Sequence, residues 1–126
     1  MSKAIPITIL TAWLAASMPA QKKDYDVPGP IELHIYLTAK PGQEAAIEKL
    51  YKDVFYPAVS KQPGFIASQL MRKPNSSDYI LRHMFKTEDL RMKWVATPEH
   101  QKAWPELTAL SSKTSWQGFG VVHPLK

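Results

Sequence analysis

The chain has 126 residues, with 16 lysines and arginines against 11 aspartates and glutamates, and a formal net charge of +5. This length suits one domain whose core is large enough to need no disulfide or metal. The sequence contains no cysteine, which excludes thiolate metal sites and thiol nucleophiles, and its basic residues are scattered, which argues against nucleic-acid binding.

The first twenty residues differ from the rest of the chain. Lys3 precedes an apolar run that ends in small residues, a pattern typical of a secretory signal peptide. The alternative is a strand or helix that packs on the domain. Pro6 and Pro19 interrupt the run, so no stable membrane span is expected. We therefore expect residues 1–30 to form an extension, with export to the periplasm or outside if it is cleaved and a cytoplasmic protein otherwise.

A domain over residues 31–126 is predicted to begin after the turn at Pro28-Gly29-Pro30. Residues 31–40 alternate strictly between apolar and polar side chains, which predicts a strand. Residues 43–61 carry apolar side chains at three- and four-residue steps, which predicts one amphipathic helix.

Two further strands are predicted over 65–73 and 78–86, joined by a hairpin loop. Thr87 is expected to cap a helix, and Thr97 with Pro98 is expected to restart it. Pro105 is then expected to kink this helix or begin a new turn.

A fourth strand is predicted over residues 116–124, where Gly118 and Gly120 indicate a bulge or a close approach by another backbone. The order β-α-β-β-α-β predicts an α+β, ferredoxin-like fold, with a four-stranded antiparallel sheet and two helices on one face. The third strand carries large apolar groups on both faces. We therefore expect a homodimer formed through the second face of the sheet.

Four stretches resemble segments of one known family. They are AKPGQEAAI (39–47), QPGFIASQLMR (62–72), YILRHMFKTED (79–89) and WVATPEHQKAW (94–104). In order, and over about three quarters of the chain, they resemble the antibiotic biosynthesis monooxygenase domain of the dimeric α/β-barrel superfamily.

The resemblance implies a reaction as well as a fold. Family members oxidise polyaromatic phenols or quinols with molecular oxygen, usually without metal or flavin. The sequence contains no cofactor motif, and none is expected. We expect a cofactor-independent monooxygenase of a phenolic or quinol-like compound, with a pocket between the second helix and the sheet. The alternatives are a non-catalytic dimeric module that binds a small aromatic ligand and, more distantly, an exported haem- or metabolite-handling protein.

The resemblance also places the candidate residues. His100 stands where the family has its second histidine and is a candidate for proton transfer, although it could equally face solvent. Trp94 stands where the family often has the first histidine, and an indole cannot act as a base. His83 is either a second proton carrier or a hydrogen-bonded core residue. Candidate pocket walls are Tyr36, Phe85, Trp94 and Trp104, and His34 could face either the pocket or a partner.

One branch of the family degrades haem with an asparagine on the first strand, a tryptophan after strand three and a histidine on the second helix. This chain has its only asparagine at Asn75, in the hairpin loop, and Phe85 at the end of strand three. His100 is the only member of that triad present. The sequence therefore argues against haem degradation.

Overall fold

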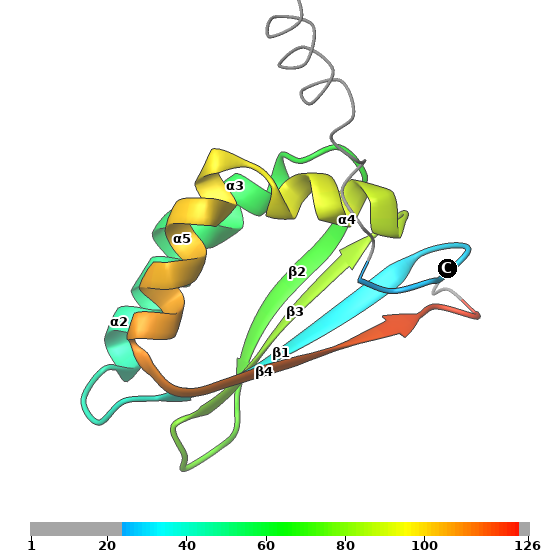
Figure 1. Ribbon diagram of the computed structural model, residues 1–126. Coiled ribbons are helices and arrows are strands. Elements are labelled where there is room, and N and C mark those ends of the chain that lie inside the picture. The colour runs from blue at the N-terminus through cyan, green and yellow to red at the C-terminus, as the bar shows by residue number, and fades with distance from the viewer. Residues whose placement is uncertain (1–23, 124–126) are drawn as a thin grey trace, which may run out of the picture.

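The computed structural model describes residues 24–123, which form one sheet with the helices on one side of it (Figure 1). The predicted signal segment lies outside the described residues. The elements in chain order are β1 (Ile31–Ala39), α2 (Glu44–Leu50), a π-helical turn (Tyr51–Phe55), α3 (Tyr56–Ser60), β2 (Phe65–Arg72), β3 (Asp78–Phe85), α4 (Glu88–Val95), α5 (Pro98–Ala109) and β4 (Ser111–Gly120). This order confirms the predicted ferredoxin-like fold. Between residues 24 and 123, no helix is long and apolar enough to cross a membrane.

The sheet has the strand order β2-β3-β1-β4 and all its pairings are antiparallel. Alternate residues of β1, from Ile31 to Ala39, are buried under the helices. Leu33 pairs with His83 of β3, so His83 lies on this helix-covered face. The side chains of His34 and Tyr36 lie on the opposite, open face, because successive residues of a strand point to opposite sides. The sequence could not assign either histidine to a face.

The helix predicted over 43–61 is interrupted by the π-helical turn. Pro57 explains the interruption, because it has no N–H for the carbonyl of Asp53 and its ring would clash with that carbonyl in a regular α-helix. The N–H of Tyr56 bonds instead to the carbonyl of Tyr51, five residues earlier. The wider turn directs Phe55 into the core, where its side chain is fully buried.

The second helical region follows the predicted caps. Thr87 Oγ1 accepts a hydrogen bond from the N–H of Leu90 at 3.1 Å, and Thr97 Oγ1 accepts one from the N–H of His100 at 3.2 Å. Of the two outcomes expected at Pro105, the new turn is wrong, since α5 continues through that residue to Ala109. Ala103 and Leu107, on either side, are fully buried, and their packing outweighs the backbone hydrogen bond that proline removes.

Strand β4 begins at Ser111, five residues earlier than predicted, and ends at Gly120. Gly118 and Gly120 form no bulge; the register shift in this pairing lies between Thr38 and Ala39. A Cβ on Gly118 would lie 2.6 Å from the ring of Tyr25, and one on Gly120 would lie 3.0 Å from Val27. The glycines therefore make room for side chains of the segment Asp24–Val27, here named the strap, rather than for another backbone.

Candidate active site

A hollow of about 100 Å³ lies between α5 and the β1–β4 side of the sheet. This is the region between the second helix and the sheet where the sequence predicted a pocket. Its apolar walls are Leu33, Ile35, Val95, Trp104 and Trp116. The polar groups on its wall are His100 and Asp24. Such a combination of apolar walls and few polar groups is typical of a small-molecule site.

His100 stands in the first turn of α5, where the Thr97 cap holds its backbone. Its ring lies parallel to Trp104 with centroids 6.0 Å apart, and edge-on to Trp94 at 5.1 Å. Its Nδ1 is buried and has no hydrogen-bond partner among the described residues. Burial, and then the charge of Arg91, lowers the pKa of His100 to about 4. The imidazole is therefore neutral near pH 7.

His83 lies deeper, on β3, and is not on the wall of the hollow. Its Nδ1 is 3.0 Å from Ser68 Oγ, while its Nε2 is buried without a partner among residues 24–123. Burial is the main cause that lowers the pKa of His83 to about 3, followed by the charges of His100 and Arg91. Phe55 stacks on His83 with centroids 5.5 Å apart and meets His100 edge-on at 6.4 Å. One aromatic ring thus contacts both histidines.

A hydroxyl pair extends the contacts of His83. The hydroxyl of Tyr51, from the π-helical turn, lies 2.8 Å from Ser68 Oγ. Burial raises the pKa of Tyr51. The chain Tyr51–Ser68–His83 fixes the imidazole orientation, because each hydroxyl can donate one hydrogen bond and accept another. Sequence reasoning missed Tyr51 and Ser68; only the pairing of Ser68 with His83 across β2 and β3 brings them together.

A buried ion pair on α4 lies near the two histidines. Arg91 Nε donates to Glu88 Oε1 at 2.7 Å, and both side chains are buried. Arg91 also donates to Asp24 Oδ2 at 3.0 Å. Burial opposes the charge on Arg91, but the hydrogen bonds and charges of Glu88 and Asp24 outweigh it and raise the pKa of Arg91. Arg91 therefore stays charged and disfavours protonation of both histidines.

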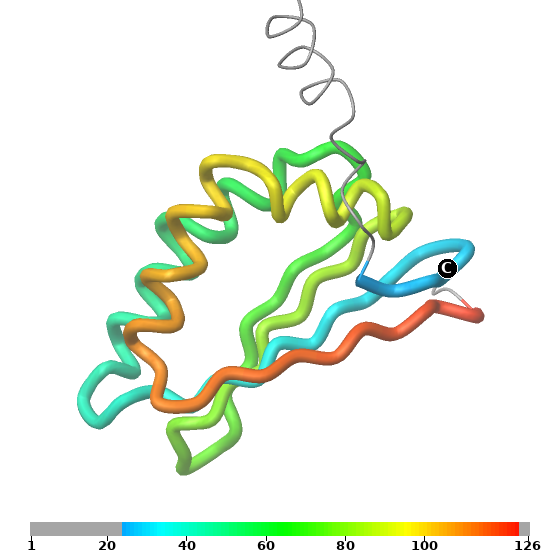
Figure 2. The backbone as a smooth tube through the Cα atoms, viewed as in Figure 1, coloured from blue at the N-terminus to red at the C-terminus, as the bar shows by residue number. Residues whose placement is uncertain are grey.

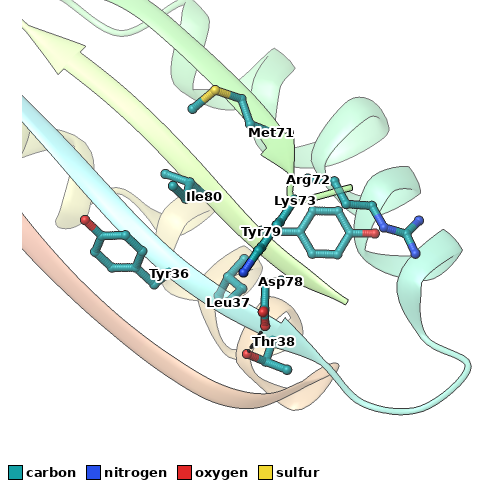
Figure 3. Close-up of a pocket in the computed structure, with 9 residues that line it drawn as sticks. All are labelled: Tyr36, Leu37, Thr38, Met71, Arg72, Lys73, Asp78, Tyr79 and Ile80. Carbon is teal, nitrogen blue, oxygen red and sulfur yellow. Dashed lines mark hydrogen bonds between the residues drawn. The ribbon is translucent and has the colours of Figure 1, made fainter. Parts of the chain in front are cut away.

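Of the predicted wall residues, Trp104 lines the hollow, whereas Trp94 is buried against His100 and is not on the wall. Phe85 and Tyr36 lie elsewhere. Phe85 is fully buried against Phe65, with ring centroids 6.1 Å apart, and does not reach the hollow. Tyr36 lies on the open face, where its hydroxyl donates to Gln117 at 3.2 Å. Figure 3 shows Tyr36 with Ile80 and Met71 around a separate hollow of about 440 Å³. The structure brings together His83, His100, Trp94 and Trp104, and it separates Tyr36 and Phe85 from them.

His34 shares the open face with Tyr36. Its Nε2 is 2.6 Å from Glu32, whose carboxylate also accepts from Arg82 at 2.8 Å. Among the described residues, no three histidine, aspartate or glutamate side chains are arranged to hold a metal ion.

Comparison with solved structures shows the same fold in several proteins. The oxygenase SnoaB from Streptomyces nogalater, described as cofactor-independent, is 20% identical, with a TM-score of 0.69 over 78% of this chain and 98% of that chain. A Caulobacter crescentus protein, 18% identical, has a TM-score of 0.69 over 75% of this chain and 92% of that one. At such identities the likeness concerns the fold alone.

Comparison of the sequence itself adds the family. No curated protein sequence matches the chain significantly. The sequence profile described as antibiotic biosynthesis monooxygenase matches residues 30–105, more than half of the chain. That match includes β1 to α4 and the first part of α5, with His83 and His100. The chain therefore belongs to the antibiotic biosynthesis monooxygenase family.

Proposed function

We propose that the protein is a cofactor-independent monooxygenase that oxidises a phenolic or quinol-like small molecule with molecular oxygen. One observation carries the proposal: His100 lines an apolar hollow, is neutral near pH 7, and has a buried Nδ1 without a hydrogen-bond partner among the described residues. Membership of the family, and the fold shared with a cofactor-independent oxygenase, support it.

The reaction needs no reductant other than the substrate. A phenol with a free ring position supplies all the electrons. One oxygen atom of O2 enters the ring, so that the phenol becomes a quinone, and the other oxygen atom is released as water. Removal of the hydroxyl proton starts the reaction, because the phenolate is the electron-rich form that reduces oxygen. In this scheme His100 accepts that proton, and the aromatic walls hold the ring while excluding water.

The low pKa of His100 describes the site before a substrate binds. A phenolate formed next to the ring places a negative charge within hydrogen-bond reach, which favours the protonated imidazole. Proton transfer is then coupled to binding, and a ligand without an acidic hydroxyl leaves His100 neutral.

Oxygen uptake with a panel of phenols and hydroquinones tests the proposal. We expect uptake by the wild-type protein, and a decrease of about 100-fold or more in His100→Ala, the range of a lost general base. His123→Ala, at an exposed position, is the control and should keep full activity. Equal rates in wild type and His100→Ala would remove His100 from the mechanism, and no uptake with any compound would contradict the proposed activity.

The second candidate is a non-catalytic module that binds a small aromatic ligand. The depressed pKa values of both histidines favour it, because neither ring is a strong base before binding. Trp94, where relatives often carry a histidine, favours it too. Ligand-dependent shifts of the Trp104 indole signal without oxygen uptake would support this candidate over the first.

We further propose that two copies associate through the open face. Met71 and Phe119 leave 38% and 44% of their surface exposed, and both lie on this face. Light scattering should give a dimer for wild type and for Val54→Lys, on the helix side, but a monomer for Ile80→Lys. A monomeric wild type would contradict association.

We also propose that residues 1–20 direct export. An intact Met1 on natively expressed protein would contradict export.

A further inference from the structure

The strap supplies part of the wall of the hollow. Asp24 lines the hollow beside His100, and Tyr25 and Val27 pack against the core. In Figure 2 the blue start of the described chain passes between α4 and the end of β4. The family profile begins at residue 30, so the strap lies outside it. This wall is therefore an addition to the part of the chain that defines the family.

Buried charges anchor the strap. Glu88 Oε2 accepts hydrogen bonds from the N–H groups of Asp24 and Tyr25 at 3.0 and 3.1 Å. The Arg91 guanidinium lies 5.5 Å from the centre of the Tyr25 ring and also donates to Asp24. A buried ion pair is stable only when its remaining donors and acceptors are bonded. The strap supplies those partners, so its docking is tied to the stability of α4.

Gly118 and Gly120 of β4 provide the packing surface on the other side of the strap. Their missing side chains leave the space that Tyr25 and Val27 occupy. The strap is thus held by hydrogen bonds on the α4 side and by close packing on the β4 side.

The hollow is small and partly open to solvent. Its volume of about 100 Å³ is well below the roughly 300–1,000 Å³ of pockets for drug-sized ligands. It is closer to a cavity of about 150 Å³ that holds one benzene molecule. A single aromatic ring can be held within this volume, whereas three fused rings would extend beyond the wall that the strap forms.

We propose that the strap sets the substrate class of this site by limiting it to single-ring phenols and hydroquinones. This inference rests on the proposed function, since it names the substrate of the same hollow. His100 and Asp24 are the polar residues on its wall, and an imidazole and a carboxylate can each accept a hydrogen bond, which suits a ring with a hydroxyl group at each end.

Two glycine variants form a matched test. Gly118→Ala places a methyl group against the Tyr25 ring and displaces the strap, whereas Gly29→Ala has no atom within 4 Å of the new methyl group. Tyr25→Ser releases the strap without changing β4. Circular dichroism of the three variants confirms that each is folded.

The measurement is titration of the protein under nitrogen with hydroquinone, 1-naphthol and 1-anthrol, followed by the indole NMR signals of Trp104 and Trp116. We expect wild type and Gly29→Ala to bind hydroquinone and not 1-anthrol. In Gly118→Ala and Tyr25→Ser, the affinity for 1-naphthol should rise by about tenfold or more relative to hydroquinone.

The inference is overturned if wild type binds 1-anthrol as tightly as hydroquinone, if it binds no hydroquinone, or if both strap variants keep the wild-type preference. Because binding is measured without oxygen, this result is separate from the proposed reaction. A size preference without oxygen uptake contradicts the monooxygenase alone, and oxygen uptake from three-ring phenols by wild type contradicts the strap proposal alone.

Discussion

Histidines lie on both sides of the sheet, but their ring nitrogens differ in whether they have a hydrogen-bond partner. On the open face, His34 bonds to Glu32, which also pairs with Arg82. On the helix-covered face, His83 and His100 each keep a buried nitrogen without a partner in the described part of the chain. Buried polar atoms are nearly always bonded, so the two unpartnered nitrogens set these histidines apart from His34. Residue type alone would not have separated the two faces.

The largest expected effect compares a carboxylate on α4, on the helix side of the sheet, with one on the open face. Glu88→Gln removes the charge that compensates buried Arg91, and we expect a loss of about 3–5 kcal/mol in the free energy of unfolding. Glu32→Gln on the open face should cost about 1 kcal/mol, since solvent reaches its partners. Chemical denaturation measures both changes. Similar losses at the two positions would remove the energetic distinction between the faces.

The second effect is on pH dependence. The folded-state pKa values of His83 and His100, about 3 and about 4, lie below the ordinary value of 6.5. At pH values between the unfolded-state and folded-state pKa values, the unfolded chain binds protons that the folded protein does not. The free energy of unfolding therefore falls as the pH decreases from about 6.5 to about 4. The slope should approach about 1.4 kcal/mol per pH unit for each histidine.

Urea denaturation over a pH series measures that slope. His100→Gln should remove about half of it, and Ala109→Ser, an exposed change on the same helix, should keep it. Stability that stays constant between pH 6.5 and pH 4 in wild type would mean that both rings can be protonated in the folded state.

The third effect concerns the hydroxyl pair. Ser68→Ala leaves both nitrogens of His83 unpartnered and should cost about 1–3 kcal/mol. Tyr51→Phe removes only the outer hydroxyl and should cost less. Nitrogen NMR of the His83 ring should show a mixed tautomer in Ser68→Ala and a single one in wild type. An unchanged tautomer would show that Ser68 does not orient the ring.

The smallest effect separates two similar caps. Thr87→Ala should cost about 1 kcal/mol, because it removes one capping hydrogen bond. Thr97→Ala should cost more, because the Thr97 hydroxyl also donates to the carbonyl of Trp94 at 2.7 Å. Thr97 also holds the backbone of His100, so only Thr97→Ala should weaken hydroquinone binding. Equal binding in the two variants would mean that the position of His100 does not depend on its cap.

Local chemistry explains what the sequence predicted well. The alternation over residues 31–40 and the caps at Thr87 and Thr97 are set by neighbouring residues, and the structure contains them. Other features depend on distant residues. The contact of Ser68 with His83 requires the register of two strands, and the seat of Tyr25 requires Gly118. The placement of Tyr36 on the open face also needed the pairing of β1 with its neighbours.

The first half of β4 is polar, so the sequence pattern did not predict it as a strand. The same residues protect the molecule from aggregation. Within residues 24–123, β4 is an edge strand that pairs with β1 alone. A long apolar edge would recruit strands from other molecules and favour aggregation. Ser111 to Ser115, with Lys113 among them, make this edge polar and charged. We expect Lys113→Val together with Ser115→Val to increase light scattering on heating, while the fold of each molecule stays intact.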